Sequence, residues 1–183
     1  GRPEVAQQLA EAAIEAHPDE ATFHEILAAA RARNGASPDL VLRSYQRALE
    51  LDAARTQSML ALARHDAEIG NRASAITRVE TFLDANPESG SPEVSRQYAE
   101  WLAETGRGEE ARDQIRNLLI EDPTDVASAL ALARWHLDEK GGNPERARIY
   151  VQQAQRFGGG DSARDLADRL SEEPNPREGK PAL

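Results

Sequence analysis

The sequence contains no cysteine. This absence excludes disulfide bonds, zinc sites built from thiolates and cysteine nucleophiles. Aromatic residues are also scarce, at 4% of the 183 residues. A β-sandwich is disfavoured by this scarcity, because strands favour β-branched and aromatic side chains. Closely packed helices suit the composition better, since the abundant alanine has the highest helix propensity and lets two backbones approach.

Positive charge is in short supply as well. The chain has 22 Lys and Arg against 32 Asp and Glu, for a formal net charge of −10. A nucleic-acid partner is not expected, because binding to phosphates generally needs an excess of basic residues. No segment approaches the roughly 18 apolar residues of a membrane span, so we expect no membrane insertion in this segment. The composition predicts a soluble chain and leaves its compartment, cytoplasmic or periplasmic, unknown.

What the sequence does contain is a repeat of about 34 residues. Four similar segment ends lie 35, 34 and 36 residues apart, at Pro18, Ala53, Pro87 and Pro123. A glycine followed five residues later by alanine marks a second position of the repeat, at Gly1, Gly70 and Gly106. The two markers alternate along the chain, which indicates a unit of two helices joined by a turn.

Each marker has a physical reason in a helical hairpin. Glycine fits the position after a helix, where a left-handed backbone is often required. Proline cannot continue a helix and therefore ends the second helix of a unit. Apolar residues at three- and four-residue spacing, such as Tyr98, Trp101 and Leu102, predict helices, and no window shows sustained strand alternation.

This pattern resembles the tetratricopeptide repeat family. Residues 56–89 carry it in Leu62-Ala63, Gly70, Ala75 and Pro87. The corresponding residues of 92–125 are Tyr98-Ala99, Gly106, Ala111 and Pro123. Residues 21–53 and 126–158 match less completely. The resemblance implies an all-α fold, a right-handed α-solenoid of stacked antiparallel helical hairpins.

The repeat also predicts the domain organisation. We expect one repeat domain over residues 1–172, with an orphan helix at 1–17 and repeats at about 21–53, 56–89, 92–125 and 126–158. A capping helix over 161–172 is expected to close the stack, because terminal repeats need one polar side. Residues 173–183, rich in proline, are expected to form a disordered tail. Since the first helix lacks its hairpin partner, we expect the natural protein to extend further toward its N-terminus.

Residues that could carry catalysis or hold a metal show no supporting pattern. The histidines, His17, His24, His65 and His136, have no partner at metal-ligand spacing. The glycine clusters at 106–108 and 158–160 do not complete a phosphate-binding motif, and a turn or cap role explains them. We therefore predict that the chain is not an enzyme and binds no cofactor or metal.

The resemblance implies that the first helices of the hairpins line a concave face that binds a protein or peptide partner. Projecting the family pattern gives these partner-binding residues: Gln57, Leu60, Arg64, Glu68, Glu93, Arg96, Glu100, Glu104, Leu130, Arg134 and Asp138. We expect Arg64, Arg96 and Arg134 to form a ladder that grips carboxylates of the partner. Alternatively, Arg–Glu pairs only solvate this face. Trp101 and Trp135 are expected to pack between repeats rather than anchor a partner.

Three functions remain open on these grounds. The leading prediction is a protein-protein interaction scaffold that binds a peptide or helix in the groove, in assembly of a bacterial envelope or secretion complex. A second is a regulatory or docking region of a larger enzyme whose catalytic domain lies upstream. A third is a self-assembly module that forms a homo-oligomer through an uncovered end of the stack.

Overall fold

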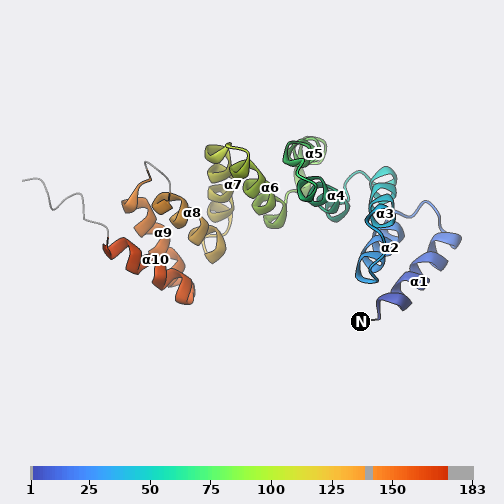
Figure 1. Ribbon diagram of the computed structural model, residues 1–183, viewed down its shortest axis with the longest axis horizontal. Coiled ribbons are helices and arrows are strands. Elements are labelled where there is room, and N and C mark those ends of the chain that lie inside the picture. The colour runs from blue at the N-terminus through green and yellow to red at the C-terminus, as the bar shows by residue number, and fades with distance from the viewer. Residues whose placement is uncertain (1, 139–141, 173–183) are drawn as a thin grey trace, which may run out of the picture. The chain divides into compact units, whose positions relative to one another are not determined.

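The computed structural model describes residues 2–138 and 142–172, and the regular secondary structure of these ranges is entirely helical (Figure 1). The α-helices are 13 or 14 residues long, and short turns join them where the connecting residues are described. Their bounds are α1 Pro3–Ala16, α2 Ala21–Arg33, α3 Pro38–Leu51, α4 Thr56–Glu68, α5 Arg72–Ala85, α6 Pro92–Glu104, α7 Gly108–Glu121, α8 Val126–Asp138, α9 Pro144–Arg156 and α10 Gly160–Glu172, with a 3-10 turn η1 at Pro87–Ser89. The tail expected at 173–183 lies outside the described residues.

The chain divides into two compact units. The first contains α1 to α6 and ends at Arg107, and the second begins at Gly108 and contains α7 to α10. In the first unit, each of the helices α1 to α5 packs on the helix that follows it, so that the last of these contacts joins α5 to α6. In the second unit α7 packs on α8 and α8 on α9, while α10 contacts both α8 and α9. The repeat expected at 92–125 therefore has its first helix in one unit and its second helix in the other.

Glycine ends the first helix of three expected hairpins. Gly35, Gly70 and Gly106 have φ of 71°, 85° and 83°, in the left-handed region. After Gly70, the Asn71 amide donates a hydrogen bond of 2.8 Å to the Asp66 carbonyl, which satisfies an acceptor at the helix end. The prediction that glycine is needed after these helices is confirmed, because an L side chain is strained at such φ values.

Alanine forms the close contacts between helices. The alanines at matching positions of the first helices, all at most 1% exposed, are Ala28, Ala63, Ala99 and Ala133. Those of the second helices, all fully buried, are Ala75, Ala111 and Ala147, and α3 has its buried alanine, Ala48, later in the helix. Larger apolar side chains fill the remaining core, among them Met59, Val79, Leu102 and Leu132. This core of small side chains lets neighbouring helices pack closely within each unit.

Candidate protein-binding site

The residues predicted on the first helices of the middle repeats form one face of α4 and α6. On α4, Gln57, Arg64 and Glu68 are spaced seven and four residues apart and so share one side of the helix. Gln57 and Glu68 are exposed, and Arg64 is half-buried. The matching predicted residues of α6 are all exposed: Glu93, Arg96, Glu100 and Glu104.

Two predicted binding residues belong to the core instead. Leu60 is 0% exposed and Leu130 is 8% exposed, so neither can contact a partner, and this part of the prediction is wrong. The matching position of α6 is Arg96, which is exposed. The position lies at the border of the face, where an aliphatic side chain gains by burial while a guanidinium group stays in water.

The Arg64 side chain joins two successive repeats across this face. Its Nη2 lies 2.8 Å from Oε1 of Glu93 on α6, and its Nε donates a hydrogen bond of 3.2 Å to Gln97. The Gln57 amide donates to the other oxygen of Glu93 at 3.2 Å. These bonds, first that of Arg64 and then that of Gln57, lower the pKa of Glu93 below its ordinary value. An Arg–Glu pair of the kind considered from the sequence is therefore present in the first unit, where it connects two repeats.

A hollow of about 240 Å³ opens beside this pair, between α4 and α6. Its lining includes four predicted residues, Arg64, Glu68, Glu100 and Glu104. Arg72 and Gln97 also line it and were missed by sequence reasoning. Arg72 is the first residue of α5 and forms an ion pair with Glu104. The family projection considered first helices only; the signal that could have found Arg72 is a basic residue directly after the glycine turn.

The two tryptophans differ in exposure. Trp101 is 4% exposed and supports one side of the hollow from within the core. Trp135 of the second unit is half-buried. The prediction of a packing role is confirmed for Trp101, which presents almost no surface for a partner.

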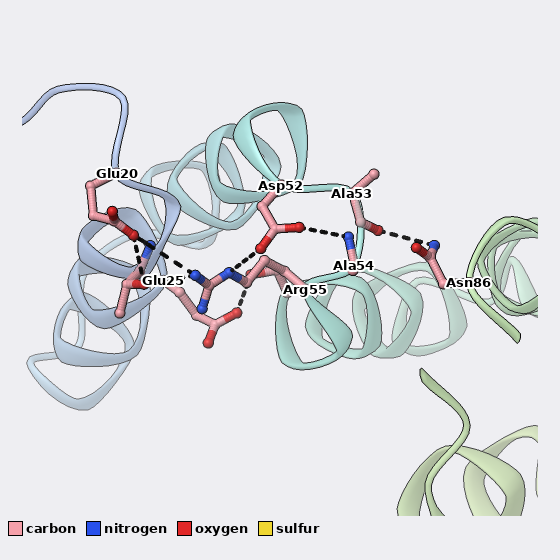
Figure 2. Close-up of polar contacts among 9 residues, drawn as sticks. Glu20, Glu25, Asp52, Ala53, Ala54, Arg55 and Asn86 are labelled. Atoms are coloured by element: carbon pink, nitrogen blue, oxygen red, sulfur yellow. Dashed lines mark hydrogen bonds and ion pairs between the residues drawn. The ribbon is translucent and has the colours of Figure 1, made fainter. Parts of the chain in front are cut away.

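A polar junction fixes α4 against the preceding hairpin. Figure 2 shows Arg55, just before α4, between Asp52 and Glu20. Its Nε donates to Asp52 at 3.0 Å, and its Nη2 donates to the Thr22 hydroxyl at 2.7 Å and lies 3.9 Å from the Glu20 carboxylate. One guanidinium thus links the start of α2 to the turn between α3 and α4.

A second bond of this junction comes from a buried serine. Ser58 of α4 is 0% exposed, and its hydroxyl donates to the Glu25 carboxylate of α2 at 2.7 Å. At the other end of the repeat, the Asn86 side-chain amide donates to the Ala53 carbonyl at 3.3 Å (Figure 2). Together these contacts set the position of α4, and hence of Arg64 and Glu68, relative to its neighbours.

Three predicted residues, Leu130, Arg134 and Asp138, lie on α8 in the second unit. Arg134 and Asp138 are exposed on α8. Asp138 forms an ion pair with Arg169 of α10. Arg64 and Arg96 lie in the first unit and Arg134 in the second, so the ladder of three arginines stays a prediction.

The described ranges contain neither a metal-binding cluster nor a membrane-spanning helix. Within residues 2–138 and 142–172, no three histidine, aspartate or glutamate side chains are grouped so as to hold a metal ion. In the same ranges, every helix is too short or too polar to cross a membrane.

Comparison with known proteins identifies the fold. The family model described as tetratricopeptide repeat matches residues 1–57 and 60–126. The chain is similar to the solved structure of PilF from Pseudomonas aeruginosa, with a TM-score of 0.74 and 20% identity, over 93% of this chain and 76% of that one. It is also similar to PilW, a widely conserved type IV pilus biogenesis factor, with a TM-score of 0.65 and 16% identity, over 93% and 89%.

A third similar structure is YrrB, a tetratricopeptide protein with an unusual peptide-binding site. Its TM-score is 0.65 and its identity 16%, over 91% of this chain and 84% of that one. At such identities these likenesses show a shared fold. No curated protein sequence is significantly similar to this one. Since the family model matches more than half of the sequence and the helices pack as its repeats require, the chain belongs to the tetratricopeptide repeat family.

Proposed function

We propose that the chain is a non-catalytic scaffold that binds a peptide or helical segment of a partner protein across α4 and α6. Tetratricopeptide repeat proteins bind protein or peptide partners, and the fold supports a role as an interaction scaffold. The observation that carries the proposal is the hollow of about 240 Å³ in which Arg64, Glu68, Glu100 and Glu104 come together. It lies on the face where the sequence predicted a partner.

The size and lining of the hollow suit recognition of a side chain. A volume of about 240 Å³ accommodates one long side chain rather than a whole small-molecule ligand, since ligand pockets span about 300–1,000 Å³. Charged groups of both signs surround it, and the rigid helices beneath hold them in place. A partner segment that lies across α4 and α6 would be recognised through contacts of its successive side chains with these charged groups.

The process served by the scaffold is the finer part of the proposal. One similar structure, PilW, is described as a type IV pilus biogenesis factor, and 89% of that chain is covered. We propose that this chain likewise takes part in assembly of a bacterial envelope or secretion complex. Neither nucleic acid nor a membrane is part of the proposed interaction, in keeping with the net charge of −10.

A selection from a random peptide library tests the proposal without assuming a partner. Peptides selected on the immobilised chain are measured against the unaltered protein and against Glu100→Arg by calorimetry. We expect Glu100→Arg to weaken binding at least about tenfold, or about 1.4 kcal/mol. The matched control is Asp84→Arg, which makes the same charge change at an exposed position of α5 that does not line this hollow.

Selected peptides that bind both variants equally well would place the binding surface elsewhere and overturn the proposal. The same follows if no peptide is retained by the unaltered chain at micromolar concentration.

Self-association is a second candidate function, and one observation favours it. On α1, Val5 is 43% exposed and Leu9 is 67% exposed, four residues apart on one side of the helix. A second copy could cover these side chains. Light scattering over a range of protein concentrations tests this: Val5→Glu with Leu9→Glu should abolish a dimer, and a chain that stays monomeric throughout rules the candidate out.

A further inference from the structure

A second hollow adjoins the first on the other side of α4. It has a volume of about 360 Å³ and lies between α4 and the hairpin of α2 and α3. Val41, Leu42 and Tyr45 of α3 supply its apolar wall, and Ala61 of α4 supplies part of its floor. Both hollows share Arg64 and Glu68. The face therefore holds a hollow with an apolar wall, named the apolar hollow although Arg64, His65 and Glu68 also line it, and a charged hollow that shares Arg64 and Glu68 with it.

The arginines around the charged hollow are already engaged. Arg64 binds Glu93 at 2.8 Å and Gln97 at 3.2 Å, and Arg72 is paired with Glu104. A partner carboxylate could reach either guanidinium only by displacing one of these contacts. An acidic segment is thus opposed by the bonds it must break and by repulsion from the remaining carboxylates.

Two of the three carboxylates around the charged hollow, Glu68 and Glu100, form no ion pair with these arginines in the described residues, whereas Glu104 is paired with Arg72. Within the described parts of the chain, the exposed Glu68 side chain forms no hydrogen bond or ion pair. Glu100 accepts a hydrogen bond from Gln97 at 2.8 Å, and the donor is a neutral amide. The charge that the face offers to a partner is consequently negative, and it is centred on the boundary between the two hollows.

The apolar hollow also contains one polar group with spare bonding capacity. Tyr45 is half-buried, and its hydroxyl forms no hydrogen bond to any part of the chain that the structure describes. A peptide backbone crossing the hollow would offer carbonyl acceptors to this hydroxyl. Tyrosine suits such a role because it provides apolar contact area together with a hydrogen-bonding tip.

From these contacts we infer that the partner segment carries an apolar side chain and, a few residues away, a lysine or arginine. The apolar side chain enters the hollow of Val41, Leu42 and Tyr45, and the basic side chain pairs with Glu68. This inference rests on the proposed function, since it names the chemistry of the ligand of the same face. It replaces the expectation from sequence that the arginines grip partner carboxylates.

Pairs of short synthetic peptides test the inference. Each pair shares a frame with one leucine and differs only in a second position, lysine or glutamate, placed at varied distances from the leucine. Fluorescence anisotropy gives the affinity of each peptide for the unaltered chain and for Glu68→Lys. We expect the best lysine peptide to bind about tenfold more tightly than its glutamate twin, and Glu68→Lys to reverse this order.

Asp84→Lys is the matched control, because it makes the same charge change at an exposed position of α5 that lines neither hollow. The control should retain the lysine preference. Exchanging the leucine for serine should weaken binding as well, since the apolar hollow then stays unfilled.

Two outcomes overturn the inference in distinguishable ways. Peptides that bind and still respond to Glu100→Arg, but show no lysine preference or prefer glutamate, overturn the inference and leave the proposed function standing. Absence of binding by every peptide in the set, together with failure of the random library, overturns both.

Discussion

Arg64 on α4 and Glu93 on α6 lie 2.8 Å apart and connect two successive repeats across the candidate binding face. Both side chains remain more than 40% exposed, so water screens their attraction. The pair consequently matters more for the geometry of the face than for overall stability. It holds the guanidinium over the boundary between the two hollows and keeps it from partner carboxylates.

This pair makes a prediction about acid stability. Arg64 and Gln57 lower the pKa of Glu93 in the folded chain, so the stability that the pair contributes is present above the unfolded pKa of about 4.3. It is lost as the pH falls below that value, through the folded pKa. Glu93→Gln should therefore flatten the pH dependence of urea unfolding between neutral pH and pH ~3.

A double-mutant cycle checks the same pair at neutral pH. Arg64→Gln, Glu93→Gln and the double variant should give a coupling energy of about 0.2–1 kcal/mol, which salt reduces. The contact would be contradicted by a coupling energy of zero at low salt, together with a loss of stability at acid pH that is the same in Glu93→Gln as in the unaltered chain.

The buried serine of α4 gives a second prediction. Ser58→Ala removes the hydroxyl that donates to Glu25 at 2.7 Å, and should destabilise the chain by about 1 kcal/mol in urea unfolding. The loss stays modest because Glu25 is only partly buried and water can replace the donor. Thr77→Ala on the exposed side of α5 is the control, expected within about 0.5 kcal/mol of the unaltered chain. Equal effects of the two substitutions would show that the Ser58 bond contributes nothing.

The backbone features of this fold could be predicted from the sequence, because each of them requires a particular type of residue. A left-handed residue after the first helix requires glycine, so Gly70 and Gly106 marked their turns. A close helix crossing requires a small side chain, so Ala63 and Ala99 marked the packed positions. Helix existence and order follow from such constraints without knowledge of tertiary contacts.

The details of the binding face could not be derived in this way. Leu60 and Arg96 occupy matching positions of α4 and α6, yet one is buried and the other exposed. The periodicity gives only the direction of a side chain, while its own chemistry decides whether a neighbour covers it. Tyr45 and Arg72 reach the hollows from second helices, and that proximity arises only when the hairpins stack.

Glycine at the junction of α9 and α10 gives a third prediction. A Cβ on Gly159 would lie 2.8 Å from the Ala154 carbonyl oxygen and 2.8 Å from the Ala163 Cβ. Neither atom belongs to a flexible side chain, so Gly159→Ala should cost about 1–3 kcal/mol by forcing the two helices apart. Thermal unfolding measured by circular dichroism, with hydrogen exchange of α9 and α10, would detect the loss.

Gly90→Ala is the contrasting substitution. Gly90 has φ of −61°, and its added Cβ would meet nothing nearer than a Leu83 side-chain carbon at 3.9 Å. Because alanine reduces the conformational freedom of the unfolded chain, the free energy of unfolding of this variant should be unchanged or higher, by up to about 1 kcal/mol. Comparable destabilisation by both substitutions would argue against the close approach at Gly159.

The tyrosine in the apolar hollow gives the last prediction. Burial, followed by the nearby Glu25 carboxylate, raises the pKa of Tyr45 above its ordinary value. In ¹³C NMR of chain labelled at the tyrosine ring carbon bonded to oxygen, one resonance should titrate above pH ~10, and Tyr45→Phe should remove it. Because the folded pKa is raised, the associated stability is complete below the unfolded pKa and is lost as the pH rises through the folded pKa. Tyr45→Phe should therefore lose less stability than the unaltered chain when the pH rises above ~10. A Tyr45 resonance that titrates at or below pH ~10 would show that the hydroxyl is fully hydrated rather than enclosed in the hollow.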